Sequence, residues 1–169
     1  MSVARYRPAR GAAGEASEPE RRAVYLAPGQ VFASAEPAEA STILGSCVAV
    51  CLWDPRTRAG GANHFLLPDW AGSGTGTARY GNVAIASLVQ RMEELGARRR
   101  DLQAKLFGGA AVIEAFRTRP DHLGARNVTL ARQQLEQLAI PVVAEDVGGS
   151  RGRKVLYRTD SGLALVRLI

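Results

Sequence analysis

The 169-residue sequence has few of the features that mark secreted, membrane-bound or nucleic-acid-binding proteins. It contains two cysteines, and aromatic residues make up only 6% of it. Two cysteines are too few for a disulfide framework. A surface that stacks nucleic-acid bases needs aromatic residues interleaved with basic ones, and the few aromatic residues of this sequence are not placed in that way. No apolar run approaches the roughly 18 residues that span a membrane, and residues 1–22 lack the apolar core of a signal peptide. We therefore expect a cytoplasmic protein with no membrane-inserted segment.

Positive charge is the one clear excess in the composition. The formal net charge is +6 and the pI is about 10.0, values that also occur in nucleic-acid-binding domains. The basic residues are scattered, however, with only short clusters at 98–100 and 151–154. We therefore expect a solvated basic surface and no nucleic-acid partner, with salt-sensitive DNA binding as the weaker alternative.

The remaining composition is that of a globular protein, with 46% hydrophobic and 22% charged residues. Residues 1–22 are rich in Ala, Gly, Glu, Pro and Arg without periodicity, which predicts a disordered tail. The rest of the chain, residues 23–169, suits a single domain. We expect a monomer that pairs with a partner protein.

Strand and helix patterns alternate through the middle of the chain, with hairpins at both ends. Apolar residues at helical spacing within residues 82–97 predict a helix that stops at Gly96. A second helix is expected from about Asn127, its predicted N-cap, with His122 exposed in the loop before it; a short helix is also expected within 111–119. Strand patterns occupy 23–34, 41–54, 62–68, 101–110, 141–149 and a C-terminal hairpin over 153–169. This order predicts an α/β (α+β) sandwich with a mixed sheet.

The stretch TILGSCVAV, residues 42–50, places Cys47 at the foot of a strand. The second cysteine, Cys51, lies four residues further on, which is about 13 Å in an extended chain. That separation is too long for a disulfide and keeps the two thiols from binding one zinc ion together. We expect Cys51 to be a small buried core residue.

His64 lies on the strand that follows the next turn. A four-residue turn over 54–57 would set Trp53 opposite Arg58 and Cys47 opposite His64. Directly opposed side chains share one face of a hairpin, close enough for an imidazole to reach a thiol. A register slip of one residue would place the two on opposite faces.

A cysteine beside a histidine is suited to nucleophilic catalysis. A charged imidazole lowers the thiol pKa, and the ring returns the proton to a leaving group. Gly45 and Ser46 allow backbone N–H groups to converge on an oxyanion, so the set predicts acyl transfer through a thioester. Ser41, Thr42 and Asn63 are candidates to orient the imidazole. The other interpretation is a core cysteine and an unrelated histidine, and the residues alone leave both open.

Further motifs make the pattern more specific. LGSCVAVCLWDP followed by HFLLP resembles the signature of the CheD family, the chemoreceptor glutamine deamidases of bacterial chemotaxis. ARYGNVAI, AKLFGGA, GARNV and EDVGGSRGRKV then follow in the order seen in that family. The resemblance extends over residues 24–158.

The resemblance implies a layered α/β sandwich similar in catalytic geometry to the deamidating necrotizing-factor toxins. It implies that Cys47 is the nucleophile, that His64 is its partner and that the hydroxyl of a threonine six positions before the cysteine completes the set. That position is Ser41, and Thr42 follows it, so either is a candidate. The resemblance also places Gly108-Gly109 near the substrate groove, although a tight turn is the simpler explanation of these glycines.

The implied reaction is hydrolysis of a receptor glutamine side chain to glutamate with release of ammonia. Receptor methylesterase activity is a related reaction of the same site. The implied partners are the cytoplasmic domains of methyl-accepting chemoreceptors and a CheC-type phosphatase, and no metal or cofactor is implied. The alternative is a non-catalytic module of this fold that regulates the phosphatase, and Ser41 in place of a threonine is the feature that leaves it open.

Overall fold

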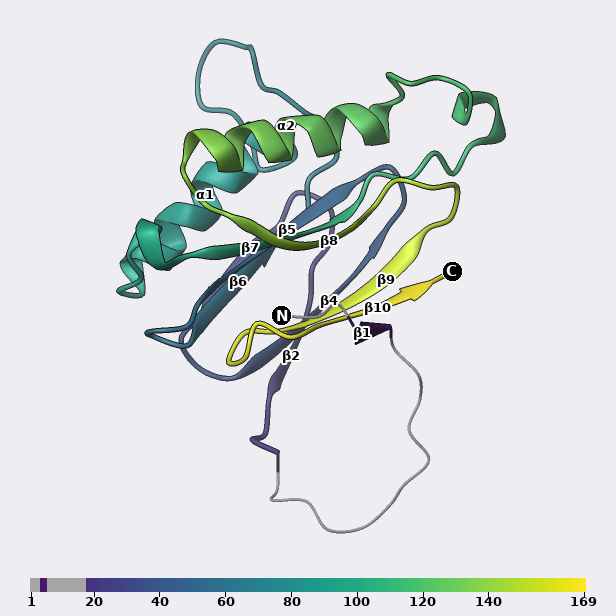
Figure 1. Ribbon diagram of the computed structural model, residues 1–169. Helices are drawn as coiled ribbons and strands as arrows, with labels where there is room; N and C mark the ends of the chain where they lie inside the picture. The colour runs from purple at the N-terminus through teal and green to yellow at the C-terminus, as the bar shows by residue number, and fades with distance from the viewer. Residues whose placement is uncertain (1–3, 6–17) are drawn as a thin grey trace, which may run out of the picture.

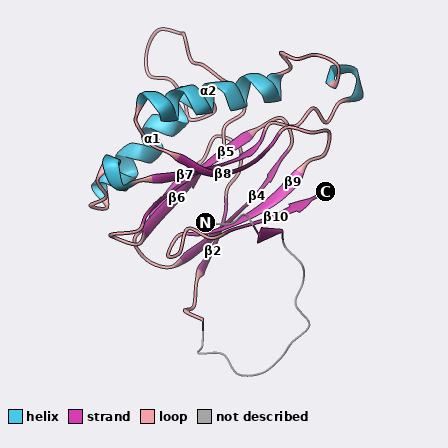
Figure 2. Ribbon diagram, in the orientation of Figure 1, coloured by secondary structure: helices cyan, strands magenta, loops and turns pink. Residues whose placement is uncertain are grey.

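The computed structural model describes residues 4–5 and 18–169, which form two β-sheets with helices on one side (Figures 1 and 2). The first, sheet A, has the strand order β1-β10-β9-β4-β2, and the second, sheet B, has the order β3-β6-β5-β7-β8. The strands of sheet A are β1 (Ala4–Arg5), β10 (Ala164–Leu168), β9 (Arg153–Arg158), β4 (Ala38–Leu44) and β2 (Arg22–Tyr25). Those of sheet B are β3 (Val31–Ser34), β6 (Ala59–Asn63), β5 (Val48–Asp54), β7 (Gln103–Gly108) and β8 (Val142–Val147). The helices are α1 (Gly81–Glu94) and α2 (Leu123–Gln137), with short 3-10 turns η1 (Arg99–Asp101) and η2 (Glu114–Phe116).

The molecule has three layers, in the order sheet A, sheet B and helices (Figure 1). One hydrophobic cluster lies between the sheets and includes Leu44, Ala49, Cys51, Phe107 and Tyr157. A second lies between sheet B and the helices and includes Val50, Ile85, Leu88, Leu106 and Leu135. Sheet B is therefore covered on both faces, whereas buried and partly exposed residues alternate along β4 and β9 of sheet A. The predicted α+β sandwich is confirmed.

Strand β5 shows how the apolar sequence serves both clusters. Its residues Val48, Val50 and Leu52 belong to the cluster under the helices, and Ala49 and Cys51 belong to the cluster between the sheets. Successive side chains of a strand point to opposite faces, so a strand at the centre of a covered sheet needs apolar residues at every position. The prediction that Cys51 is a core residue is confirmed, because its exposed fraction is 2%.

Two of the predicted strands each divide into two strands, one in each sheet. The pattern over 23–34 forms β2 and β3, and the pattern over 41–54 forms β4 and β5. The first crossing turns at Gly29, whose φ is 85°, and the second is made by residues 45–47. Cys47 therefore lies where the chain passes from one sheet to the other.

The helix predictions are confirmed for α1 and corrected for α2. Gly96, at φ 88°, follows the end of α1 as expected. Helix α2 begins before the predicted start, because the N-cap is His122, whose Nδ1 accepts a hydrogen bond from the Ala125 N–H at 3.2 Å. Asn127, the predicted cap, lies inside the helix and is fully buried.

The predicted tail over 1–22 lies mostly outside the described residues, but the parts that are described belong to the fold. Strand β1 pairs in parallel with β10. Arg21 donates to Asp160 at 2.9 Å, and Arg22 begins β2. The predicted boundary between tail and domain at residue 22 was therefore wrong, because residues 4–5 and 18–22 also belong to the fold. Among the described residues, no helix combines the length and apolarity needed to cross a membrane.

Candidate active site

Cys47 and His64 share the face of sheet B that is turned toward sheet A. Strands β5 and β6 pair Cys51 with Ala62, and an isolated bridge pairs Val48 with Phe65. If the register is continued beyond the last paired residues of β5 and β6, His64 lies opposite Ala49. The predicted direct pairing of His64 with Cys47 was therefore wrong by two residues. A shift of two keeps a side chain on the same face, and Cys47 does pack against the cluster between the sheets.

The turn after β2 holds His64 through its backbone and its ring. The His64 N–H donates to the Gln30 carbonyl at 3.0 Å, and its carbonyl accepts from the Gly29 N–H at 2.7 Å. The ring atom Nδ1 lies 2.8 Å from Thr42 Oγ1 and 3.3 Å from the Leu26 carbonyl oxygen. These four contacts come from two separate segments, the turn over 26–30 and strand β4, and together they fix the position of the imidazole.

The hydrogen bonds of Thr42 select the tautomer of His64. Thr42 Oγ1 donates to the Leu26 carbonyl at 2.8 Å. A hydroxyl has one proton to donate, so the same oxygen accepts from His64 Nδ1–H. The neutral ring then carries its lone pair on Nε2. That atom is buried and has no hydrogen-bond partner among residues 18–169, so it is available to take a proton.

Of the two hydroxyls considered from the sequence, the structure brings Thr42 to His64 and not Ser41. Thr42 is 4% exposed and points between the sheets. Ser41, the next residue on β4, points to the opposite face, where its neighbours across the sheet are Tyr25 and Leu156. Asn63, the third candidate, uses Oδ1 to accept from the Val50 N–H at 2.9 Å.

Three successive carbonyls of the cysteine loop, residues 45–47, are held by donors from other segments. Gly45 accepts from the Ala110 N–H at 2.8 Å and Cys47 accepts from the Gly109 N–H at 2.8 Å. Ser46 accepts from Asn127 Nδ2 at 3.0 Å. Among residues 18–169, the N–H groups of Ser46 and Cys47 have no acceptor in another residue.

The glycine pair after β7 makes this arrangement possible. Gly108 and Gly109 have φ values of 106° and 70°, a region that side chains rarely adopt. A Cβ on Gly108 would overlap the Cys47 carbonyl oxygen, and one on Gly109 would lie 2.9 Å from the Gly124 carbonyl oxygen. Both glycines are buried and lie beneath the cysteine loop.

Burial shifts the two titrating groups toward their uncharged forms. It raises the pKa of the Cys47 thiol above its ordinary value, although the residue's own backbone N–H opposes the shift. Burial also lowers the pKa of His64, against the opposing effect of the Leu26 carbonyl. These directions favour a neutral thiol and a neutral imidazole at rest, in contrast to the charged histidine expected from the sequence.

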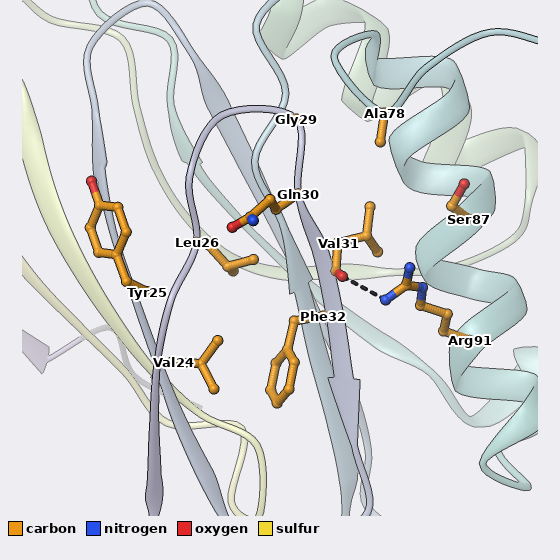
Figure 3. A pocket seen from close by; sticks show the side chains of 10 residues that line it. All are labelled: Val24, Tyr25, Leu26, Gly29, Gln30, Val31, Phe32, Ala78, Ser87 and Arg91. Atoms are coloured by element: carbon orange, nitrogen blue, oxygen red, sulfur yellow. Dashed lines mark hydrogen bonds between the residues drawn. The ribbon is translucent and has the colours of Figure 1, made fainter.

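Two cavities are lined by residues of the segments that hold the site. The larger, about 500 Å³ in volume, lies between β2, β3 and α1, where Arg91 donates to the Val31 carbonyl (Figure 3). Its lining includes Leu26 and Gln30, so it borders the back of the turn that holds His64, but neither Cys47 nor His64 lines it. The smaller, about 110 Å³, includes Ser46 in its lining. Exposed apolar residues border this second cavity: Val112, Ile113 and Phe116.

The family model and the named relatives agree on one family. Residues 66–168 match the family model described as CheD chemotactic sensory transduction. A protein of Anaeromyxobacter dehalogenans named probable chemoreceptor glutamine deamidase CheD 1 is 52% identical over 157 residues, which cover 92% of this chain and 91% of that protein. An alignment over 92% of the chain necessarily includes Cys47 and His64, which precede the residues matched by the family model.

Further relatives show the same similarity. Proteins named probable chemoreceptor glutamine deamidase CheD from Trichlorobacter lovleyi and Sulfurimonas denitrificans are 46% and 40% identical over 145 residues. These alignments cover 86% of this chain and 89% and 93% of the two proteins.

A solved structure, hypothetical protein YfiH of Bacillus licheniformis, has a TM-score of 0.44 and 18% identity over 68% of this chain and 49% of that one. Because the family model matches more than half of the chain and the relatives match nearly all of it, this chain belongs to the CheD family.

Proposed function

We propose that this chain is a chemoreceptor glutamine deamidase that acts through a thioester on Cys47. The observation that carries the proposal is the environment of His64: Nδ1 is bound to Thr42, and Nε2 is buried without a partner among residues 18–169, on the face toward which Cys47 packs. The names of the relatives support the substrate, a glutamine of a chemoreceptor.

The first half of the proposed reaction forms the thioester. Cys47 Sγ attacks the side-chain carboxamide carbon of the glutamine while His64 Nε2 takes the thiol proton. Because burial keeps both groups neutral at rest, proton transfer accompanies the attack. The negative charge that forms on the amide oxygen faces the free N–H groups of Ser46 and Cys47.

Collapse of this intermediate breaks the carbon–nitrogen bond. His64 returns its proton to the nitrogen, which leaves as ammonia, and the acyl group stays on Cys47. In the second half, a water molecule gives a proton to His64 Nε2 and attacks the thioester carbon. The carbon–sulfur bond breaks, and the sulfur regains the proton from His64. The new carboxylic acid loses its remaining proton to the released ammonia or to solvent, so the glutamine has become a glutamate with one additional negative charge.

The test is incubation of the full chain with a glutamine-bearing cytoplasmic fragment of a chemoreceptor, followed by intact-mass analysis and ammonia measurement. We expect the mass change of deamidation with the wild-type protein and with Cys51→Ala, because Cys51 is buried within β5. We expect none with Cys47→Ala or His64→Ala. Deamidation by Cys47→Ala would refute the thioester.

Two finer proposals use the same site. A methylated receptor fragment tests methylesterase activity, because the thiol would attack the ester carbon and release methanol; this activity is expected to disappear with Cys47→Ala. A CheC-type phosphatase is the partner implied by the family resemblance. Binding of this phosphatase without deamidation of any receptor fragment would instead identify a regulatory module and refute the enzyme.

A further inference from the structure

Asn127 of α2 links the two segments that carry the proposed nucleophile and its base. Its Nδ2 donates to the Ser46 carbonyl at 3.0 Å and to the Leu66 carbonyl at 2.8 Å. Ser46 directly precedes Cys47, and Leu66 lies two residues after His64. One side-chain amide therefore ties the cysteine loop to the histidine segment.

The bond to Ser46 also sets the direction of the Cys47 N–H. The Ser46 carbonyl and the Cys47 N–H belong to one planar trans peptide, so they point in opposite directions. With the carbonyl held by α2, the N–H points away from that helix. The next peptide back is fixed in the same way, because Ala110 N–H holds the Gly45 carbonyl and so orients the Ser46 N–H.

We infer that Asn127 is a positioning residue for the oxyanion of the reaction, and that it acts by holding the Ser46–Cys47 peptide so that the Cys47 N–H faces the substrate oxygen. The inference rests on the proposed acyl-transfer function. The side chain has an exposed fraction of 0%, and its Oδ1 has no partner among residues 18–169. A buried amide with one unpartnered oxygen is costly to retain, so the two bonds made by Nδ2 need a compensating role.

A purely structural role for Asn127 predicts something different. If the amide only satisfied two buried carbonyls, its loss would lower stability and would affect every reaction of Cys47 equally. If it aims an oxyanion donor, its loss affects reactions with a tetrahedral intermediate and spares those without one. The chain offers a matched control in Gln134, which lies on the same helix and donates from Nε2 to the Asn82 carbonyl at 2.9 Å.

The experiment compares two reactions of Cys47 that need no receptor. In acylation by p-nitrophenyl acetate, Sγ bonds to the carbonyl carbon through an oxyanion, and the bond to p-nitrophenolate breaks. In alkylation by iodoacetamide, Sγ displaces iodide from a saturated carbon and no oxyanion forms. The rates are measured in wild type, Asn127→Ala, Asn127→Leu and Gln134→Ala, with Cys47→Ala as the blank and thermal melts to identify folded samples. Asn127→Leu keeps most of the side-chain volume if the alanine variant does not fold.

We expect the ratio of acylation to alkylation to fall on the order of tenfold in the Asn127 variants, which is less than the loss on removal of a whole donor. The ratio is expected to stay unchanged in Gln134→Ala. On a receptor fragment, the same variants are expected to lower kcat with little change in KM. Equal losses in acylation and alkylation, an unchanged ratio, or failure of both Asn127 variants to fold would overturn the positioning role. Absence of receptor deamidation by the wild type would refute the proposed function and leave the ratio as an independent test of Asn127.

Discussion

Replacement of Thr42 by valine tests the orientation of the proposed catalytic base, His64, most directly. Valine has nearly the shape of threonine but no hydroxyl, so Thr42→Val removes the 2.8 Å contact with His64 Nδ1 and leaves the packing between the sheets in place. The Leu26 carbonyl, 3.3 Å from Nδ1, remains as a second acceptor. The ring therefore keeps its tautomer but loses its better partner.

The size of the effect on the reaction follows from the one hydrogen bond to His64 that is lost, since the other bond of the hydroxyl, to the Leu26 carbonyl, does not involve the imidazole. A net contribution of about 0.5–1.5 kcal/mol per bond corresponds to a decrease of about 2- to 13-fold in kcat/KM. A much larger loss would mean that the Leu26 carbonyl does not replace the hydroxyl. Stability is expected to fall by about 1 kcal/mol, because two hydrogen bonds of the hydroxyl are lost while the Leu26 carbonyl, freed from the hydroxyl, accepts the bond from Nδ1.

The assay is the rate of receptor deamidation by intact mass, measured for Thr42→Val, Thr42→Ser and Ser41→Ala. Thr42→Ser retains the hydroxyl and is expected to be close to wild type. Ser41→Ala is the matched control, because Ser41 is the adjacent hydroxyl residue and faces away from His64. Wild-type activity in Thr42→Val together with a loss in Ser41→Ala would refute the assignment and restore Ser41 as the third residue.

Two further predictions concern the charge state of the thiol and the support beneath it. Because burial raises the pKa of Cys47 and lowers that of His64, the rate of alkylation by iodoacetamide is expected to rise with pH through a midpoint above the ordinary thiol value of about 8.5; a rate already maximal at neutral pH would indicate a preformed ion pair. Cys51 does not interfere, since burial raises its pKa to about 12. Gly109→Ala is expected to destabilise the fold by more than about 1 kcal/mol in urea unfolding and to lower deamidation, because its φ is 70° and its Cβ would lie 2.9 Å from the Gly124 carbonyl. Gly149→Ala, with φ 72° and no atom within 4 Å of its Cβ, measures the backbone strain alone, and an equal loss in both variants would contradict a role for the close packing.

The cysteine–histidine pair could be predicted from sequence because two errors did not matter. The predicted register of the hairpin was wrong by two residues, but side chains repeat every second position, so Cys47 and His64 stayed on one face. The predicted strand over 41–54 is two strands in different sheets, but Cys47 still precedes the second of them. The choice between Ser41 and Thr42 is different, because adjacent residues of a strand face opposite ways and an error of one residue selects the wrong side chain.

The residues that hold the cysteine loop and the imidazole in place could not be predicted from the sequence patterns. Leu26 and Asn127 act through contacts between segments that are 38 and 81 residues apart in the chain. Asn127 follows Arg126 in a stretch that reads as a helix start, and asparagine is a common N-cap, so a local interpretation was available and wrong. No local pattern distinguishes a buried amide that binds another segment from one that caps its own helix.

The position of the site follows from the two crossings between the sheets. Strands β2 and β4 are parallel neighbours in sheet A, so both crossings leave that sheet at the same end. They enter sheet B as β3 and β5, which flank β6 on either side, and His64 directly follows β6. The first crossing thus brings the Leu26 carbonyl to the imidazole and the second brings Cys47 to the same face of sheet B, while Thr42 contacts the imidazole from β4. Separate crossings hold the proposed base and the proposed nucleophile. A substitution in the turn over 26–30 should therefore disturb proton transfer while leaving the thiol in place, and one in the cysteine loop should alter the thiol while leaving the imidazole bound to Thr42.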